Sequence, residues 1–301
     1  MKDNVCILIP TLNEEASIGE IVTDFKSLGY ENVLVIDGHS TDKTVEVATK
    51  SGATVVVQAG KGKGSALKQA FAMIKQDIVV LIDGDGTYLP SEVERLLEPI
   101  AKGEADHVIG NRFEAYESGA FTRLNLFGNK VLNKLFGLGY GVWLNDILSG
   151  YRAFTNRAVK ELELNKTGFE IEAEMTIECV KKDLRTAEVP VTYLSRRHGV
   201  ATKLSPLGDG ARIGYTIYRL ASTYNPLFYL GLLGLLCITI GIVFGVYIVI
   251  DYSHGIQNLA MIVFTSMVIL VGFLLALFGV IGNLMVYFHK EMMREFRKRE
   301  H

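Results

Sequence analysis

The sequence is poor in cysteine and has almost no net charge, and each deficit excludes a class of protein. Its three cysteines, Cys6, Cys179 and Cys237, are too widely spaced for a metal-ligand pattern or a disulfide framework, so they fit a reducing cytosol. A formal net charge of -2 over 301 residues gives no basic excess that would indicate binding to nucleic acid. No signal peptide is expected, because the first apolar run, "VCILI", has five residues and ends at a proline.

Hydrophobic residues are concentrated in two long uncharged runs, residues 227–250 and 259–288. Each exceeds the ~20 residues needed to cross a bilayer, so we predict a hairpin of two transmembrane helices. The connection "DYSHGIQN" carries no lysine or arginine, whereas the tail 289–301 and the stretch before the first run are basic. The positive-inside rule therefore predicts a multi-pass protein of the cell membrane, with the N-terminal domain and both termini in the cytoplasm. A pair of buried helices in a soluble protein is the alternative.

From residue 4 onward, short apolar runs alternate with segments of helical periodicity. The predicted strands are residues 5–9, 33–36, 54–57, 78–82 and 107–109. This alternation predicts an α/β fold with a mostly parallel sheet, in a domain that spans residues 1–204. Residues 205–226 are expected to form an amphipathic helix before the first apolar run.

Polar clusters follow all five predicted strands. In chain order they are "PTLNEE", "DGHSTD", "GKGKG", "DGDGTY" and "GNRF". Any one of them fits an ordinary turn, because Gly, Asn, Asp and Ser favour turns for local backbone reasons. Ligands of such sheets bind at the carboxyl ends of the strands, so five clusters in register indicate one site on that rim.

Asp83 and Asp85 are separated by one glycine and directly follow a predicted strand. Hard divalent cations such as Mg²⁺ or Mn²⁺ prefer oxygen ligands and bridge substrate phosphates, so this pair predicts a metal site. A calcium loop is the competing interpretation. It fails because Tyr88 stands where that loop requires glycine, and because Pro90 lies inside it.

The other loops lack the fingerprints of common nucleotide sites. "GKGKG", with Lys61 and Lys63, opens a predicted helix and suits an anion, but its spacing is not that of a P-loop. "DGHSTDKT" is not a dinucleotide fingerprint, and "PTLNEE" contains no glycine. We therefore interpret Asp37 as a carboxylate that hydrogen-bonds a base or ribose, and Asp42 as a helix N-cap.

Eight segments together resemble the family 2 glycosyltransferases of GT-A fold, which has a Rossmann-like, mostly parallel sheet. They are "IPTLNEE", "VIDGHSTDKT", "GKGKG", "LIDGDGTY", "GNRF", "LSGYRAF", "GFEIEAEM" and "RRHGVATKL". Over residues 4 to about 204 the sequence is most similar to the dolichyl-phosphate hexose synthases, and especially to archaeal members. The resemblance implies a metal-dependent, inverting enzyme that moves one sugar from a nucleotide sugar to dolichyl phosphate, with membrane lipid as a further partner.

The resemblance also implies a nucleotide-sugar site. Its residues are Pro10, Thr11, Asn13, Glu14, Glu15, Asp37, Lys61, Lys63, Asp83 and Asp85. Asp83 and Asp85 match the D-x-D motif that holds Mg²⁺ or Mn²⁺. Related mannose synthases often carry glutamine two residues after the second aspartate, where this chain has Thr87, so the match does not extend to a third metal ligand there.

Catalytic and acceptor-phosphate residues are implied in the same way. The catalytic set is Asp85, Arg112 and Arg152, and the residues for the acceptor phosphate are Ser149, Arg152, Arg196, Arg197 and Lys203. The carboxylates of "FEIEAEM" are ambiguous. Glu170, Glu174 and Glu178 share one helix face and Glu172 points elsewhere, so they form either a solvated acidic face or support for the metal and active site, with Glu170, Glu172 and Glu174 as the supporting set.

Residues 121–143 form a segment that is both basic and amphipathic. In "FTRLNLFGNKVLNKLFGLGYGVW", Leu124, Val131 and Leu135 recur at helical spacing, with Lys130 and Lys134 among them. Such a helix can lie on a membrane surface or pack against the domain, and both interpretations stay open.

The donor is predicted from overall resemblance to be UDP-glucose or UDP-N-acetylglucosamine, and the product to serve protein N-glycosylation. A GDP-mannose-dependent dolichyl-phosphate mannose synthase is the main alternative. A processive polysaccharide synthase is a weaker one, because two spans are few for a translocation channel and no Q-x-x-R-W motif is present. A non-catalytic membrane scaffold that binds sugar nucleotides would tolerate the loss of Asp83 and Asp85.

Overall fold

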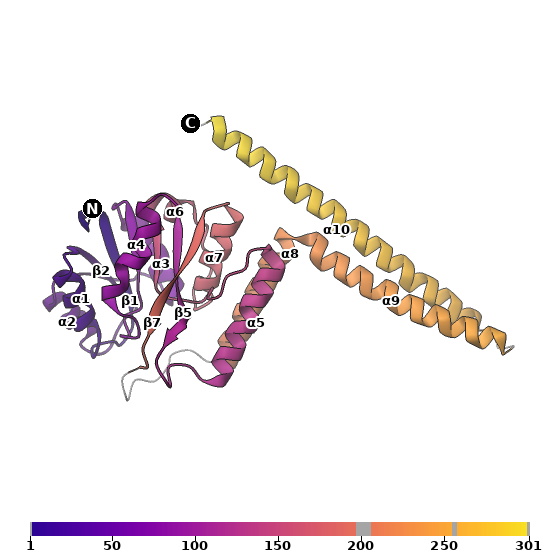
Figure 1. The fold of residues 1–301 in the computed structure, drawn as a ribbon, viewed down its shortest axis with the longest axis horizontal. Coiled ribbons are helices and arrows are strands. Elements are labelled where there is room, and N and C mark those ends of the chain that lie inside the picture. Colours follow the sequence, from indigo (N-terminus) through magenta and orange to yellow (C-terminus); the bar gives the residue numbers. More distant parts are fainter. Residues whose placement is uncertain (1, 197–205, 255–257, 300–301) are drawn as a thin grey trace. The chain divides into compact units, whose positions relative to one another are not determined.

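The computed structural model describes residues 2–196, 206–254 and 258–299. The chain divides into two compact units, Met1–Ile217 and Tyr218–His301, and we describe each by itself. Figure 1 shows the strands and most of the helices in the first unit, and the two longest helices in the second. The predicted site residues all belong to the first unit.

The first unit is built on one seven-stranded sheet with the strand order β3-β2-β1-β4-β6-β5-β7. The strands are β1 (Val5–Thr11), β2 (Asn32–Asp37), β3 (Thr54–Val57), β4 (Ile78–Leu81), β5 (His107–Tyr116), β6 (Arg152–Thr155) and β7 (Thr186–Tyr193). Strand β6 runs antiparallel to β4 and β5, whereas the other neighbours pair in parallel. The predicted α/β fold with a mostly parallel sheet is confirmed.

Helices cover both faces of this sheet. They are α1 (Ile18–Ser27), α2 (Thr44–Lys50), α3 (Lys63–Met73), α4 (Val93–Ala101), α6 (Asn156–Glu161) and α7 (Ile171–Lys181). The unit also contains α5 (Arg123–Tyr140), the start of α8 (Pro206–Tyr224) and short 3-10 turns at Lys2–Asn4 and Pro90–Glu92. Alternate residues of β1 face opposite sides, so Ile7 packs with α1 and α4, and Leu8 packs with α3, α6 and α7. Burial on both faces explains why the central strands are nearly continuous apolar runs.

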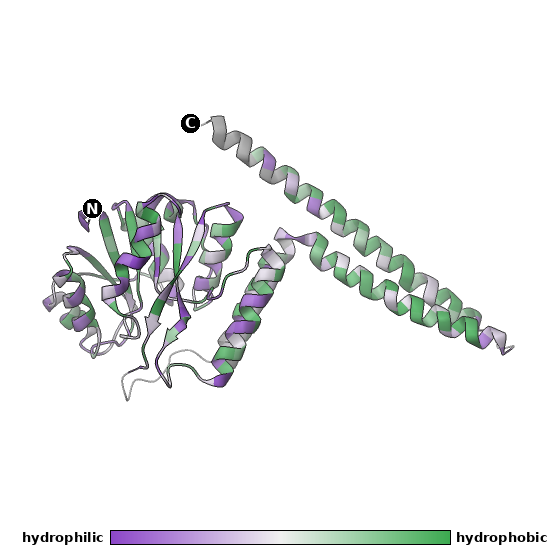
Figure 2. Cartoon of the chain, viewed as in Figure 1, coloured by the Kyte–Doolittle hydropathy of each residue, from purple (hydrophilic) through white to green (hydrophobic). Residues whose placement is uncertain are grey.

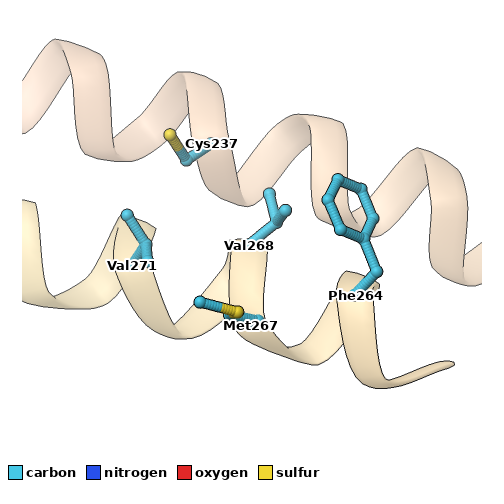
Figure 3. A pocket seen from close by; sticks show the side chains of 5 residues that line it. All are labelled: Cys237, Phe264, Met267, Val268 and Val271. Carbon is cyan, nitrogen blue, oxygen red and sulfur yellow. The ribbon is translucent and has the colours of Figure 1, made fainter. Parts of the chain in front are cut away.

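The second unit contains α9 (Pro226–Ser253) and α10 (Leu259–Arg299), which lie side by side. The helices approach closely at glycines, since a Cβ atom at Gly234 would lie 2.5 Å from the carbonyl oxygen of Gly272. Asn225 caps α9 by accepting a hydrogen bond from the Phe228 amide at 3.2 Å. Cys237 of α9 and Met267 of α10 line part of an apolar groove between the two helices (Figure 3).

Both helices contain a segment long and apolar enough to cross a membrane, Pro226–Ser253 and Leu259–Phe288. Their hydrophobic residues extend along most of each helix (Figure 2). In each segment, 11% of the apolar window is buried. The alternative of two buried helices in a soluble core requires far more burial than this, so the burial favours helices that face lipid.

Candidate active site

The loops after β1 and β2 are joined by reciprocal hydrogen bonds. The Asn13 amide donates to the Ser40 hydroxyl at 2.8 Å, and the Thr41 amide donates to Asn13 Oδ1 at 2.8 Å. The Lys43 amide donates to Glu15 Oε2 at 2.9 Å. The adjacent ends of β1 and β2 therefore bring "PTLNEE" and "DGHSTD" together, with Asn13 and Glu15 serving the junction between them.

Asp37 ends β2 and is 1% exposed. Its Oδ2 accepts from the Ser40 amide at 2.9 Å, and its Oδ1 accepts from the Ser40 hydroxyl at 2.5 Å. These bonds fix the turn after β2, much as an Asx turn does. In this structure Asp37 organises the loop, and its contact with a base or ribose stays a prediction. Asp42 accepts from the Thr44 amide and hydroxyl at the start of α2.

The turn that carries Asp83 and Asp85 follows β4 and is fixed against β1 and α1. Ser17 donates a hydrogen bond to the Gly84 carbonyl at 2.6 Å, and a Cβ atom at Gly84 would lie 2.8 Å from Thr11 Cγ2. A larger residue between the aspartates would therefore push this turn away from the end of β1.

Each of the two aspartates forms an ion pair with a basic side chain from a distant element. Lys63 Nζ lies 2.5 Å from Asp83 Oδ1 and 2.6 Å from Glu172 Oε1. Arg196 Nη2 lies 2.7 Å from Asp85 Oδ2, while the Thr87 hydroxyl donates to Asp85 Oδ1 at 2.6 Å. The structure therefore brings the ends of β4 and β7 together with the starts of α3 and α7.

Burial and ion pairing oppose each other in the pKa values of this cluster. Burial alone would raise the pKa of Asp83, but the ammonium group of Lys63 holds it below its usual value, with help from Arg112 and Arg196. Burial would lower the pKa of Lys63, but the carboxylates of Asp83 and Glu172 hold it above its usual value. Burial raises the pKa of Glu172, and Lys63 opposes that effect.

Arg112 lies on β5 and is anchored by a residue that the sequence had not singled out. Asp146 is fully buried, and its two carboxylate oxygens accept from Arg112 Nε at 2.6 Å and Arg112 Nη2 at 2.7 Å. The guanidinium carbon also lies 5.3 Å from the ring centre of Tyr193 and 5.5 Å from that of Phe121. Arg112 is thus held in one orientation at the edge of the site.

Arg152 and Ser149 lie beneath the site and are both 0% exposed. Their contact with the acceptor phosphate, and a catalytic role of Arg152, stay predictions. Arg152 donates to the carbonyl oxygens of Ile147 and Ser149 at 2.6 and 2.7 Å and to the Thr176 hydroxyl at 2.8 Å. In this structure its guanidinium therefore stabilises the segment before β6.

The carboxylates of α7 are not a solvated acidic face, because α7 is buried from Ile171 to Val180. Glu172, expected to point away from the others, is the one that reaches Lys63. Glu174 accepts from the amides of Asn165 and Lys166 at 3.0 and 2.8 Å, so it serves the preceding loop. Glu178 pairs with Lys181 at 2.7 Å, and Glu170 is half-buried at the N-cap of α7.

Two glycines of "GKGKG" allow close packing against the loop before α7, and the predicted binding of an anion by this segment stays a prediction. A Cβ atom at Gly62 would lie 2.3 Å from the Thr167 carbonyl oxygen, and one at Gly64 would lie 2.2 Å from that of Lys166. This contact leaves Lys61 exposed and directs Lys63 into the site. Of the predicted acceptor-phosphate residues, Arg197 and Lys203 lie outside the described residues.

The donor set suits a hard divalent cation, because Asp83 and Asp85 supply only carboxylate oxygens. Within the described residues there is no group of three or more His, Cys, Asp or Glu side chains that could hold a metal by themselves. The remaining ligands of a metal on this pair would therefore be water or oxygens of a substrate, as is usual for Mg²⁺ beside phosphates.

Comparison with known proteins gives one consistent family. A family model described as "Glycosyl transferase family 2" matches residues 6–162. The chain is 42% identical over 300 residues to "Glycosyltransferase AglJ" of Haloferax volcanii, with 99% of each chain covered. It is 33% identical to the "Dolichyl-phosphate hexose transferase" of the same organism, over 72% of this chain and 93% of that one.

A solved structure with a similar fold carries both a metal and a nucleotide sugar. Glucosyl-3-phosphoglycerate synthase from Mycobacterium tuberculosis, in complex with Mn²⁺ and UDP-glucose, matches with a TM-score of 0.58 and 27% sequence identity. The match covers 72% of this chain and 78% of that chain.

Proposed function

The chain belongs to the family 2 glycosyltransferases, and we propose that it transfers one hexose or N-acetylhexosamine from a nucleotide sugar to dolichyl phosphate with inversion. The proposed donor is UDP-glucose or UDP-N-acetylglucosamine, and the product would serve protein N-glycosylation. The observation that carries the proposal is the convergence of Asp83, Asp85, Lys63, Arg112 and Arg196 at one end of the sheet, in a chain with two helices of membrane-spanning length.

We assign Asp83 and Asp85 to a bound Mg²⁺ or Mn²⁺. Such a cation would neutralise charge on the donor diphosphate and stabilise the departing nucleotide. The fixed turn between the aspartates supports this role, since Ser17 and the end of β1 hold the Gly84 backbone in place. Lys63, directed into the site at the start of α3, adds a positive charge beside the diphosphate.

A phosphate monoester acceptor needs no strong general base. Its second pKa is about 6, so it is largely dianionic at neutral pH and can attack the anomeric carbon directly. One of its oxygens forms the new bond as the bond from that carbon to the donor diphosphate breaks, which inverts the configuration. The protein must chiefly offset repulsion between two anions, and Arg112 and Arg196 are the described arginines placed to do so.

The surface of α5 supports a lipid acceptor. Five apolar side chains form an exposed stripe along this helix: Leu124, Phe127, Val131, Leu135 and Leu138. Arg123, Lys130 and Lys134 are also exposed, and α5 contains no acidic residue. A basic helix with an apolar stripe fits the interface of an anionic membrane, where a lipid keeps its phosphate. We therefore propose a multi-pass membrane location, with the catalytic unit and both termini in the cytoplasm.

The donor is identified by incubating membranes that contain the protein with dolichyl phosphate, Mg²⁺ or Mn²⁺, and one radiolabelled nucleotide sugar at a time. We expect label from one UDP-sugar in the organic phase, as a single sugar on the lipid. Label from GDP-mannose alone would replace the proposed donor and favour a mannose synthase. Label in a long water-soluble polymer, or in no lipid at all, would contradict the proposed reaction.

A further inference from the structure

We propose that Glu172 is a positioning residue that acts through Lys63, orients Asp83 and sets the net charge that the D-x-D site presents to a divalent cation. The inference rests on the proposed function in one respect, which is that Asp83 and Asp85 hold the metal. It assigns a role to a buried carboxylate that does not itself have to touch the metal or a substrate.

The side chains make a short chain of ion pairs. Lys63 Nζ lies 2.6 Å from Glu172 Oε1 and 2.5 Å from Asp83 Oδ1, and the Lys63 and Glu172 side chains are 14% and 5% exposed. The second oxygen of Glu172, Oε2, is buried and makes no hydrogen bond within the described residues. A buried carboxylate is costly unless it is paired, so the contact with Lys63 is the reason that Glu172 can lie here.

The backbone places Lys63 from the same side. The Gly64 amide donates to the Thr167 carbonyl at 2.9 Å, and no Cβ fits at Gly64 because it would lie 2.2 Å from the carbonyl oxygen of Lys166. Glu174 of α7 in turn binds the amides of Asn165 and Lys166. Helix α7 therefore fixes Lys63 in two ways: through the loop that precedes α7, and through the ion pair of Glu172 with Lys63.

Asp83 is confined from the opposite side as well. A Cβ atom at Gly150 would lie 2.0 Å from Asp83 Oδ2, so the backbone of the segment before β6 closes against that oxygen. With Lys63 on Oδ1, the carboxylate has little freedom to rotate. Removal of Glu172 would free Lys63 to shift and so release this constraint on Asp83.

The net charge of this cluster predicts how each variant changes the affinity for a divalent cation. The carboxylates of Asp83, Asp85 and Glu172 face the basic groups of Lys63 and Arg196, so this cluster carries a formal charge of -1. Glu172→Gln makes the cluster neutral, whereas Lys63→Met makes it more negative. The two variants should therefore change affinity for a divalent cation in opposite directions, and the double variant, which restores the original charge, should lie between them.

The test measures Mn²⁺ binding to the full-length protein in detergent, without nucleotide or lipid, from the electron paramagnetic resonance signal of free Mn²⁺. Glu172→Gln should weaken binding by about 10-fold or more, Lys63→Met should strengthen it, and the double variant should return close to wild type. Glu178→Gln is the matched control, because Glu178 is equally buried on α7 but pairs with Lys181. Thermal melting of each variant monitors folding.

Weaker Mn²⁺ binding in both single variants, with the double variant weaker still, would overturn the proposal, because it would mean that the pair only supports the fold. Unchanged binding in Glu172→Gln would overturn it too. Asp85→Asn separates this inference from the proposed function. If that variant binds Mn²⁺ as well as wild type, the aspartate pair is not the metal site, and the proposed function loses its metal whatever Glu172 does.

Discussion

Gly150 lies so close to Asp83 that a Cβ atom at position 150 would be 2.0 Å from Asp83 Oδ2. The Gly150 amide also donates to the Tyr88 hydroxyl at 2.9 Å, so its backbone is held in place. The segment that precedes β6 therefore packs against Asp83, the first aspartate of the proposed metal pair. Arg152, buried beneath this segment, helps to hold it in place.

This contact predicts that Gly150→Ala is a defect of the site and not of the fold. The added methyl group must displace the Asp83 carboxylate from its pair with Lys63, so we expect kcat/KM to fall by roughly 10- to 100-fold. Gly128→Ala on α5 is the control, because nothing lies within 4 Å of a Cβ atom at Gly128. Steady-state kinetics with thermal melting checks this, and an active Gly150→Ala enzyme would show that Asp83 tolerates the shift.

Arg152→Met is expected to destabilise the protein by about 2–4 kcal/mol, because it removes the arginine donor from the buried carbonyls of Ile147 and Ser149. Arg157→Met is the control. That side chain is 66% exposed and pairs with Glu161 on the surface of α6, where such pairs contribute little. Thermal melting and limited proteolysis measure the difference. A stable Arg152→Met variant that has lost activity would instead support the predicted catalytic role of Arg152.

The stability of the first unit should fall in mild acid because of His107. Burial lowers the pKa of His107 well below 6.5, and the charge of Arg152 adds to this effect. In mild acid the imidazole is therefore protonated in the unfolded chain but stays neutral in the folded chain. The contribution of neutral His107 to the free energy of unfolding is therefore complete above pH 6.5 and is lost as the pH falls below that value. Melting temperatures at pH 7.5 and 5.5 should drop less in His107→Gln than in wild type, and equal drops would contradict the assignment.

The exposed stripe of α5 should matter for the lipid and not for the donor. Phe127→Ser combined with Val131→Ser is expected to raise KM for dolichyl phosphate by about tenfold, because it removes apolar area from the proposed membrane-contacting stripe, with KM for the nucleotide sugar unchanged. Met73→Ser on α3 is the control, because Met73 is also an exposed apolar side chain but lies outside the stripe. Equal changes in both KM values would indicate that α5 supports the fold instead.

The sheet was predictable where local pattern and topology agree. Strands β1 to β4 are apolar runs that end in polar turns, and these the sequence indicates directly. For β5 it indicates only the start, because the strand continues from His107 to Tyr116 and "GNRF", expected to follow the strand, lies inside it. Strand β6 was missed because it is four residues long and begins with Arg152, and β7 because it is largely half-exposed and contains Pro190. Both segments are strands because they pair with neighbouring strands, β6 with β4 and β5 and β7 with β5, and their local sequence pattern does not indicate this.

The site was predictable only where its residues are close in sequence. Asp83 and Asp85 are neighbours in sequence, so their shared position follows from one turn. The pair of Lys63 and Glu172 depends instead on α3 and α7 covering the same face of the sheet, which no local spacing reveals. Helical spacing alone even pointed to the wrong face of α7. The burial of Arg152 was not predictable for the same reason, because the local sequence does not show that its guanidinium binds the carbonyls of Ile147 and Ser149.

The most direct measurement is transfer of radiolabelled sugar from the UDP-sugar to dolichyl phosphate by purified protein, with and without Mn²⁺, in wild type and Asp85→Asn. The structure predicts Mn²⁺-dependent label in the lipid for wild type. It predicts almost none for the variant, even though the variant folds and inserts into membranes as wild type does. Undiminished transfer by Asp85→Asn, or transfer by wild type that persists after chelation of all divalent metal, would contradict the assignment of the aspartate pair.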